Sequence, residues 1–380
     1  MNHGELCDWL MNESIRGDLL KLTQLTVAAE LSNLRPEVVS ENHKQDFDWH
    51  SLLLAGSILA RSSQRIHQEA ALRIATASVS LNTDTVVKDA GVVLFEKLSN
   101  HRSVELAELR HLSLPDIESR LGVSMRMEAL RRQFDNSVLI ESTGDWLNVN
   151  GFQKSFWDGA SHEETWLSAS APTASGKTFL VLKWLIDRML SKKVAVAVYL
   201  APTRALVTEI ETSLRTLLRG YKKIEVSSLP IREKYLSAQR GDTQIIFVFT
   251  QERLHLLANI LNDQLSIDLM IVDEAHKIGD RQRGVILQDA IERVARHNEK
   301  VQAIFVSPST QNPEELLDDA PTGLARISVE SDSPTVLQNV LLAEQVPRKP
   351  KEWELKLVRE DANVAIGVLE LESRPAGVIK

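Results

Sequence analysis

Six consecutive residues near the middle of the chain have the chemistry of a phosphate-binding loop: Thr173, Ala174, Ser175, Gly176, Lys177 and Thr178. Backbone N–H groups of such a loop point at anionic oxygens, and the dipole of the following helix favours negative charge there. Lys177 can reach the β- and γ-phosphates of a nucleotide, and the Thr178 hydroxyl can ligate Mg²⁺. The strict motif has Gly where Ala171 stands, so a helix start without a nucleotide stays an alternative for the loop alone.

The second reactive group is the acidic pair Asp273 and Glu274, which directly follows the apolar run 269–272. Two adjacent carboxylates at the end of a buried strand are unfavourable unless they serve a function. Asp273 is placed to hold Mg²⁺, and Glu274 is placed to orient and deprotonate an attacking water. With Lys177 they form a predicted catalytic set for hydrolysis of a γ-phosphate, with ATP and Mg²⁺ as cofactors. An acid-lined helix start is the structural alternative.

From about residue 139 onward, short apolar runs alternate with helical patterns. The runs are 166–169, 194–200, 245–249, 269–272 and 303–306. Apolar runs without alternation are typical of strands that are buried on both faces. Strands that alternate with helices predict an α/β fold, a parallel sheet with helices on both faces, in which ligands bind at the carboxyl ends of the strands. Both reactive groups follow such a run.

The first 140 residues have a different texture, with helical apolar spacing and short loops. Asp48 and Asp84 each precede such a segment, as N-cap residues do. We expect an all-helical accessory domain over 1–140 that serves packing or partner docking, and an α/β domain over 141–330. No residue of the helical region has a catalytic or metal-ligand pattern.

Composition sets the broad class. The chain has 380 residues, a net charge of −8 and a hydrophobic content of 43%, which fits a soluble globular protein that is not basic overall. If it binds nucleic acid, it must do so through a local groove. Cys7 is the single cysteine, which suits a reducing compartment. The apolar run 52–60 is about half a membrane span. We therefore expect a cytoplasmic protein without a membrane partner.

Further motifs occur in the order found in superfamily-two DExH helicases of the Ski-like group. They lie at 149–153, 171–178, 201–206, 250–254, 273–284 and 307–316. Within them, Gln251 replaces the Pro of the family, and Pro308 replaces the Ala of its Ser-Ala-Thr motif. In helicases the loop opens with Ala-Pro-Thr, so Ala171 is expected, and Ala174 departs from a position that is usually Gly. The chain thus resembles the first RecA-like motor domain of such a helicase.

This resemblance implies roles for matching positions. Gln153 would read the adenine base of ATP. Three residues would contact the phosphate backbone of a single strand by hydroxyl, guanidinium and backbone N–H groups: Thr203, Arg204 and Thr250. Three others would couple ATP hydrolysis to the nucleic-acid track: His276, Ser307 and Ser309. The implied activity is an ATP hydrolase that moves on or unwinds DNA or RNA.

The family places its ATP site between two RecA-like domains, and the second domain supplies arginine fingers through a Gln-x-x-Gly-Arg-x-Gly-Arg type motif. No such motif follows Ser307. We therefore expect residues 331–380 to be a linker and the start of an incomplete second motor domain. The chain is then a fragment, or needs a second chain, and by itself it should be inactive.

A helical region fused to a Ski-like motor also resembles bacterial anti-phage defence helicases of the Hachiman type, which work with a partner nuclease. This architecture implies a partner nuclease docked on the helical domain. Two functions stay open: a helicase or translocase, and a nucleic-acid-stimulated ATPase sensor or scaffold that gates a partner nuclease without unwinding. A small-molecule kinase would not explain the motifs at 201–206 and 250–254. DNA and RNA are equally compatible with the sequence.

Overall fold

The computed structural model describes residues 2–35, 38–39, 47–110, 112–113, 117–172, 175–310, 312–359 and 362–371. The chain divides into two compact units. Unit 1 combines Met1–Arg131 with Ser333–Lys380, and unit 2 is Arg132–Asp332. In the described part of the chain, no helix is both long and apolar enough to cross a membrane.

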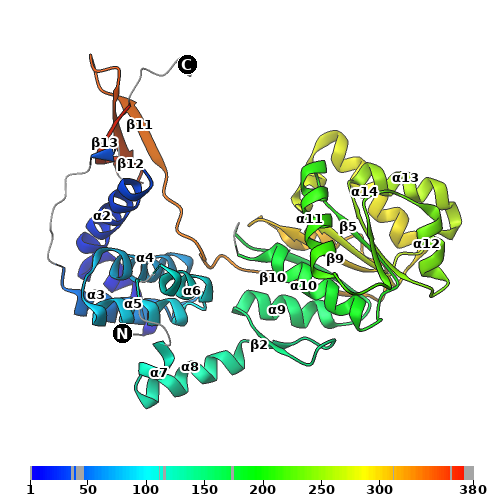
Figure 1. Ribbon diagram of the computed structural model, residues 1–380, viewed down its shortest axis with the longest axis horizontal. Helices are drawn as coiled ribbons and strands as arrows, with labels where there is room; N and C mark the ends of the chain where they lie inside the picture. The colour runs from blue at the N-terminus through cyan, green and yellow to red at the C-terminus, as the bar shows by residue number, and fades with distance from the viewer. Residues whose placement is uncertain are drawn as a thin grey trace. The chain divides into compact units, whose positions relative to one another are not determined.

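Seven strands form the central sheet of unit 2, and every neighbouring pair is parallel. In sheet order they are β10 (Ala325–Glu330), β4 (Thr165–Ser170), β9 (Gln302–Ser307), β8 (Leu269–Asp273), β5 (Val196–Leu200), β7 (Gln244–Phe249) and β6 (Ile224–Ser227). The five central strands match the predicted apolar runs, and the parallel α/β fold is confirmed (Figure 1). The two edge strands were not predicted, because their polar residues break the apolar pattern.

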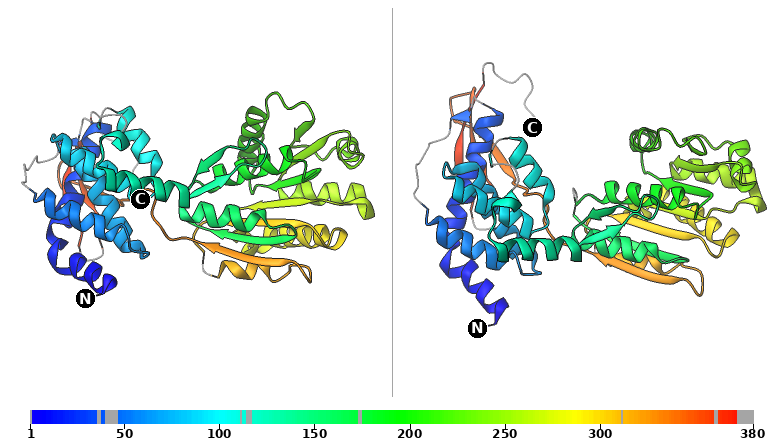
Figure 2. Two further views of the ribbon diagram at one scale, coloured as in Figure 1. Left: turned by 90° about the horizontal axis from the view of Figure 1, so that it is seen from below. Right: turned by 60° about the horizontal axis from the view of Figure 1, so that its bottom comes forward.

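Helices cover both faces of this sheet (Figures 1 and 2). One core contains side chains of α9 (Gly151–Ser161), α10 (Lys177–Leu190) and α11 (Arg204–Leu217). The opposite core contains side chains of α12 (Arg232–Gln239), α13 (Gln251–Leu261) and α14 (Arg281–His297). Successive residues of a strand point to opposite faces, so an apolar run supplies both cores at once. Short 3₁₀ helices at Asn262–Gln264 (η2), Ala275–Gly279 (η3) and Pro313–Leu317 (η4), and the hairpin β2 (Ser137–Leu139) with β3 (Trp146–Asn148), complete unit 2.

Unit 1 is built around a helical core. Its helices are α1 (His3–Trp9), a π-helical turn η1 (Leu10–Ser14), α2 (Arg16–Leu34), α3 (Trp49–Leu59), α4 (Arg65–Leu81), α5 (Thr85–Lys97), α6 (His101–Leu109) and α7 (Ile117–Arg120). α8 (Val123–Asp135) begins in unit 1, and its last four residues are counted with unit 2. Asp48 caps α3 by accepting from Ser51 N, and Asp84 caps α5 by accepting from Val86 N, as predicted.

A second sheet distinguishes unit 1 from the predicted all-helical domain. Strands β11 (Leu341–Gln345), β12 (Glu352–Leu357) and β13 (Val364–Glu370) form an antiparallel meander, and β13 pairs with β1 (Val38–Val39). Its apolar face packs on Val27 and Ala28 of α2.

The two compact units divide after residues 131 and 332, and the predicted domain boundaries at 140 and 330 stay predictions. The sequence interpretation missed this sheet, because its two-residue strand lies near the opposite end of the chain from the meander. That residues 331–380 begin a second motor domain stays a prediction.

A glycine fixes how α14 follows the acidic pair. A Cβ on Gly284 would lie 2.0 Å from the carbonyl oxygen of Ile278 in η3, so the two backbones approach too closely for any side chain. We expect Gly284→Ala to destabilise the protein by about 1–3 kcal/mol, because the backbone must move apart. Urea unfolding measures this. Gly279→Ala is the control, since a Cβ there meets nothing within 4 Å; equal stability of the two variants would contradict the close approach.

Candidate nucleotide and nucleic-acid site

The phosphate-binding loop joins the end of β4 to the start of α10. Gly176 immediately precedes the helix with a φ of 79°, a left-handed conformation that favours glycine. Ser175 is buried, and within the part of the chain that the structure describes its hydroxyl has no hydrogen-bond partner. Thr178 is exposed in the first turn of α10. Thr173 and Ala174 lie outside the described residues.

Lys177 folds back onto its own loop. Its Nζ donates to the carbonyl oxygen of Ala171 and, at 2.9 Å, to that of Pro172. Burial lowers the pKa of the ammonium group, while the negative charges of Glu274 and Asp273 act in the opposite direction. The charge of Lys177, the first residue of α10, therefore interacts with the charges of the acidic pair after β8.

Gln153 contacts the loop from α9. Asn150 and Gln153 form a reciprocal capping box, with Asn150 Oδ1 accepting from Gln153 N and Gln153 Oε1 accepting from Asn150 N. The Nε2 of Gln153 donates to Ser175 O at 3.3 Å. A Cβ on Gly176 would lie 3.0 Å from this nitrogen, so glycine also gives the amide room. Gln153 thus borders the loop, and its contact with adenine stays a prediction.

Asp273 ends β8 as a largely buried carboxylate. Its Oδ2 accepts from Tyr199 OH at 2.9 Å, and its Oδ1 accepts from Glu274 N. Burial raises the pKa of Asp273, and the Tyr199 hydrogen bond opposes this by favouring the ionised form. Sequence reasoning missed Tyr199, although a tyrosine inside a buried apolar run is a signal, because its hydroxyl needs a partner.

Glu274 sits in a strained backbone conformation directly after the strand. Its φ of 54° is uncommon for a residue with a side chain, and such strain costs about 1–3 kcal/mol. The Glu274 carboxylate lies 3.5 Å from His276 Nδ1 in η3. The turn therefore directs the predicted base toward the residue that was predicted to couple hydrolysis to nucleic acid.

The predicted nucleic-acid contacts lie after β5 and β7, which are neighbours in the sheet. Thr203 caps α11, with its hydroxyl accepting from Leu206 N, and both Thr203 and Arg204 are exposed. Thr250 differs: it is 6% exposed, and its hydroxyl interacts with Glu252. The structure therefore presents Thr203 and Arg204 to solvent but does not present the Thr250 side chain.

Arg283 joins these two loops to the helix that follows the acidic pair. Its Nη2 donates to Pro202 O at 2.8 Å, and its Nε donates to Glu252 Oε1 at 3.2 Å. The sequence suggested Arg283 only as a family signature. Its structural role is to tie the loops after β5 and β7 to the start of α14.

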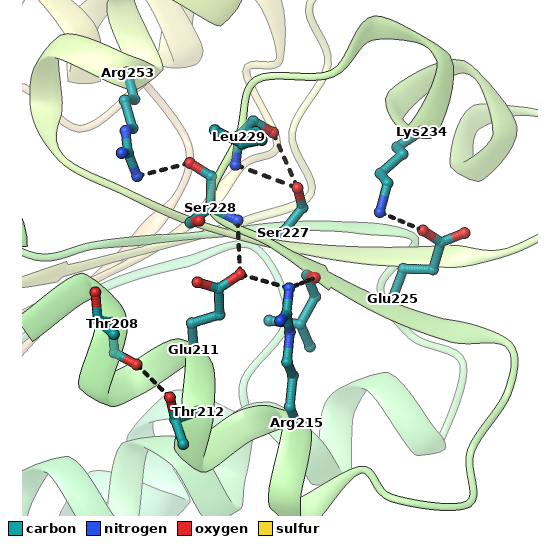
Figure 3. A network of polar contacts seen from close by, with 11 residues as sticks. Thr208, Glu211, Thr212, Arg215, Glu225, Ser227, Ser228, Leu229, Lys234 and Arg253 are labelled. Atoms are coloured by element: carbon teal, nitrogen blue, oxygen red, sulfur yellow. Dashed lines mark hydrogen bonds and ion pairs between the residues drawn. The ribbon is translucent and has the colours of Figure 1, made fainter.

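A polar network holds the loop that follows β6, at the same edge of the sheet as the loops after β5 and β7 (Figure 3). The backbone of Ser228 is held at both groups: its N–H donates to Glu211 of α11, and its carbonyl accepts from Arg253 of α13 at 2.8 Å. Arg215 donates to the same Glu211 carboxylate. Sequence reasoning missed this network, because nothing in the spacing of these residues indicates that they meet.

The end of β9 is tied to the end of β4 through hydroxyl groups. Ser170 Oγ donates to Pro308 O at 3.0 Å and accepts from Thr310 N at 3.1 Å. Ser307 Oγ lies 3.3 Å from Thr310 Oγ1. Ser309 is exposed and takes no part in these bonds. Of the two serines predicted for coupling, the structure brings only Ser307 into the network, together with Ser170 and Thr310, which were not predicted.

Tyr199→Phe tests the electrostatics of the acidic pair. The hydroxyl donates to the ionised form of Asp273, so its loss should raise the pKa of Asp273 further above its ordinary value. Carboxyl carbon shifts in protein labelled at aspartate, followed against pH by NMR, measure this pKa. An unchanged or lowered Asp273 pKa would show that the hydrogen bond is unimportant. Tyr221→Phe, at an exposed tyrosine, is the control.

Comparison with known proteins agrees with this geometry. A family model described as DEAD/DEAH box helicase matches residues 150–316. The chain is 30% identical over 167 residues to the Lhr helicase of Mycolicibacterium smegmatis. This alignment covers 38% of this chain and 11% of that protein. It is also 28% identical over 153 residues to the ATP-dependent DNA helicase Hel308 of Aeropyrum pernix. That alignment covers 40% of this chain and 20% of the relative.

The chain thus spans only a tenth to a fifth of the length of these relatives. Among solved structures, it is similar to the Mycobacterium smegmatis helicase Lhr bound to ssDNA and AMP-PNP, with 24% identity and a TM-score of 0.39, over 49% of this chain and 26% of that chain. The motifs predicted from the sequence lie within the matched region or beside it. The chain therefore contains a DEAD/DEAH-box helicase domain of the Ski-like, superfamily-two type.

Proposed function

We propose that this protein is an ATP-dependent nucleic-acid helicase or translocase. The observation that carries the proposal is the meeting of Lys177, Asp273 and Glu274 at the carboxyl edge of one parallel sheet, where their charges act on one another. A cation for phosphate, a carboxylate for metal and a second carboxylate for water are the groups that γ-phosphate hydrolysis requires. The exposed Thr203, which caps α11, and Arg204, the first residue of that helix, lie along the same edge.

The described residues of the loop fit a nucleoside triphosphate. Lys177 would exchange two neutral carbonyl acceptors for phosphate oxygens, and hydrogen bonds between charged partners are stronger. The hydroxyl of Ser175, which has no hydrogen-bond partner among the described residues, is a further polar group that a ligand could use. Gln153 lies against the loop at Ser175, next to where the nucleotide would bind.

The oxygen donors of Thr178 and Asp273 fit Mg²⁺, which prefers oxygen ligands and is usually held by one or two protein groups together with substrate phosphates. When bound, Mg²⁺ would neutralise charge on the phosphates. Glu274 would accept the proton of the attacking water. Its contact with His276 offers a route by which nucleic-acid binding could alter that carboxylate.

Arg204 is the side chain best placed to pair with a strand's phosphates, since it is exposed beside the cap of α11. Such contacts make binding salt-dependent and independent of base sequence. The sensor or scaffold function uses the same residues, so strand displacement must be measured separately from ATP hydrolysis. A role in anti-phage defence, a partner nuclease and a cytoplasmic location stay predictions.

Lys177→Ala tests the nucleotide site. We expect the variant to lose ATP affinity by at least about tenfold for each charge-assisted bond removed, and in practice to lose detectable binding. Calorimetry with Mg²⁺ and ATP measures this. Lys183→Ala, which removes a lysine from the same helix, is the matched control and should bind ATP normally. Equal ATP affinity of the wild type and Lys177→Ala would refute the site.

Glu274→Gln tests hydrolysis. The variant should bind ATP as the wild type does but lose about 10²–10⁴ in nucleic-acid-stimulated turnover, because the shape stays while the base is lost. The assay uses the chain with whatever further segments or partner its activity requires. Glu299→Gln, at an exposed acid, should leave turnover unchanged. Near-normal hydrolysis by Glu274→Gln would exclude it as the base.

A further inference from the structure

A cavity of about 600 Å³ lies within unit 2, where η3, α14 and η4 pack over β4 and β9. This volume is in the range of small-ligand sites, which is about 300–1,000 Å³. Among the described residues that line it, His276 alone belongs to the site that the sequence predicted. The cavity is therefore a feature of one compact unit and is distinct from the phosphate-binding loop.

The floor of this cavity is aromatic. Trp166 of β4 and Phe305 of β9 both line it, and each is only 1% exposed. Their ring centroids lie 5.3 Å apart, with the rings tilted by 50°. Trp166 Nε1 donates to Val301 O at 3.2 Å, which fixes the orientation of the indole. The floor is thus a rigid pair of rings.

Ser168 adds an unsatisfied polar group on this side of the sheet. It lies between Trp166 and Ser170 on one face of β4, and it pairs in register with Phe305. Ser168 is fully buried, and in the described part of the chain its hydroxyl has no hydrogen-bond partner. Buried hydroxyls in folded proteins normally have one. A ligand that brings an N–H donor to the floor would satisfy it.

The mouth of the cavity is acidic. Glu315 on η4, and Asp318 and Asp319 directly after it, line the cavity and are exposed. Glu315 accepts from Asn312 Nδ2 at 3.0 Å. Arg326 donates to the backbone carbonyl of Asp318, and within the described residues neither aspartate carboxylate has an ion pair or a hydrogen bond. Adjacent like charges repel one another, so a cation between them would be stabilising.

The floor and the mouth together select the chemistry of the occupant. Carboxylates at the mouth repel phosphate, which excludes a nucleotide and a nucleic-acid strand. An uncharged apolar ligand would cover carboxylates without giving them a partner. A cation on an apolar stem satisfies both parts, because it pairs with the carboxylates and is attracted to aromatic rings. A guanidinium group also brings five N–H donors in one plane.

We propose that this cavity binds an organic cation, a guanidinium or ammonium group on an apolar stem. Its source is either an arginine or lysine side chain of a partner protein or a small free cation. The aromatic floor receives the stem and the charged group, and Asp318 and Asp319 hold the charge at the mouth. His276 lines the cavity and contacts Glu274, so the ligand lies one side chain away from the predicted base. Only this last link rests on the proposed function.

The test uses the full chain without nucleotide and a fluorescent, capped pentapeptide, Ala-Leu-Arg-Leu-Ala. The control peptide has citrulline, the uncharged isostere, in place of Arg. Fluorescence anisotropy should show saturable binding of the Arg peptide, at least about tenfold tighter than binding of the citrulline peptide, and weakening with salt. Agmatine, a small guanidinium compound, is then added as a competitor. Displacement at equal concentration assigns the site to a free cation, and displacement only at large excess assigns it to a protein segment.

A double variant, Asp318→Asn with Asp319→Asn, should lose at least about tenfold in affinity for the Arg peptide. Glu233→Gln with Asp242→Asn, at two exposed acids that do not line the cavity, is the matched control and should bind normally. Circular dichroism of both variants should show unchanged folding, because all four side chains are exposed.

Three results would overturn the proposal. The first is no saturable binding of either the Arg peptide or agmatine, or equal binding of the Arg and citrulline peptides. The second is unchanged affinity in the double variant at the mouth. The third is an equal loss of affinity in the control variant, which would make the binding a response to the net negative charge of the chain. Because ATP is absent, a chain that failed to hydrolyse ATP would leave these results unaffected.

Discussion

Parallel pairing of all seven strands is the constraint on which unit 2 depends. Each strand must be followed by a crossover that returns to the start of the next, and these crossovers bury both faces of the sheet. All strands then end at the same edge. The loops after β4, β5, β7 and β8, which are far apart in the sequence, therefore lie side by side. No additional device is needed to bring a lysine near two carboxylates.

Burying the ionised acidic pair in this site is unfavourable for the stability of the fold. Asp273 is ionised less readily in the folded chain than in the unfolded chain, because burial raises its pKa. Its contribution to stability is therefore greatest at acid pH, below its unfolded pKa, and is lost as the pH rises through the folded pKa. Glu274 adds backbone strain to this cost. The well-packed strands around the pair supply the stability that this arrangement removes.

The sequence predicted the central strands and both reactive groups, since apolar runs buried on two faces and a lysine after a glycine are local patterns. What it missed depends on contacts between distant segments. Tyr199 gains its role only because β5 and β8 pair, and Ser228 is held only because α11 and α13 flank the loop after β6. The meander at the C-terminal end was missed because its partner strand is two residues near the start of the chain. The burial of the Thr250 side chain was not foreseen either, since position in a motif does not reveal exposure, and the predicted contact of Thr250 with a nucleic-acid strand stays a prediction.

In the phosphate-binding loop, backbone carbonyl oxygens occupy the ammonium group of Lys177, so they compete with any ligand for it. The ammonium group is already satisfied by two carbonyl oxygens, so any incoming group must offer more than a neutral acceptor to displace it. Adenine or ribose cannot do so, whereas oxygens that carry a full negative charge can. The apparent affinity of such a ligand would equal its intrinsic affinity multiplied by the fraction of molecules in which the lysine is free to meet it. A fully charged oxygen is thus the kind of group that would draw Lys177 away from its carbonyl acceptors, and a neutral one would leave it where it is.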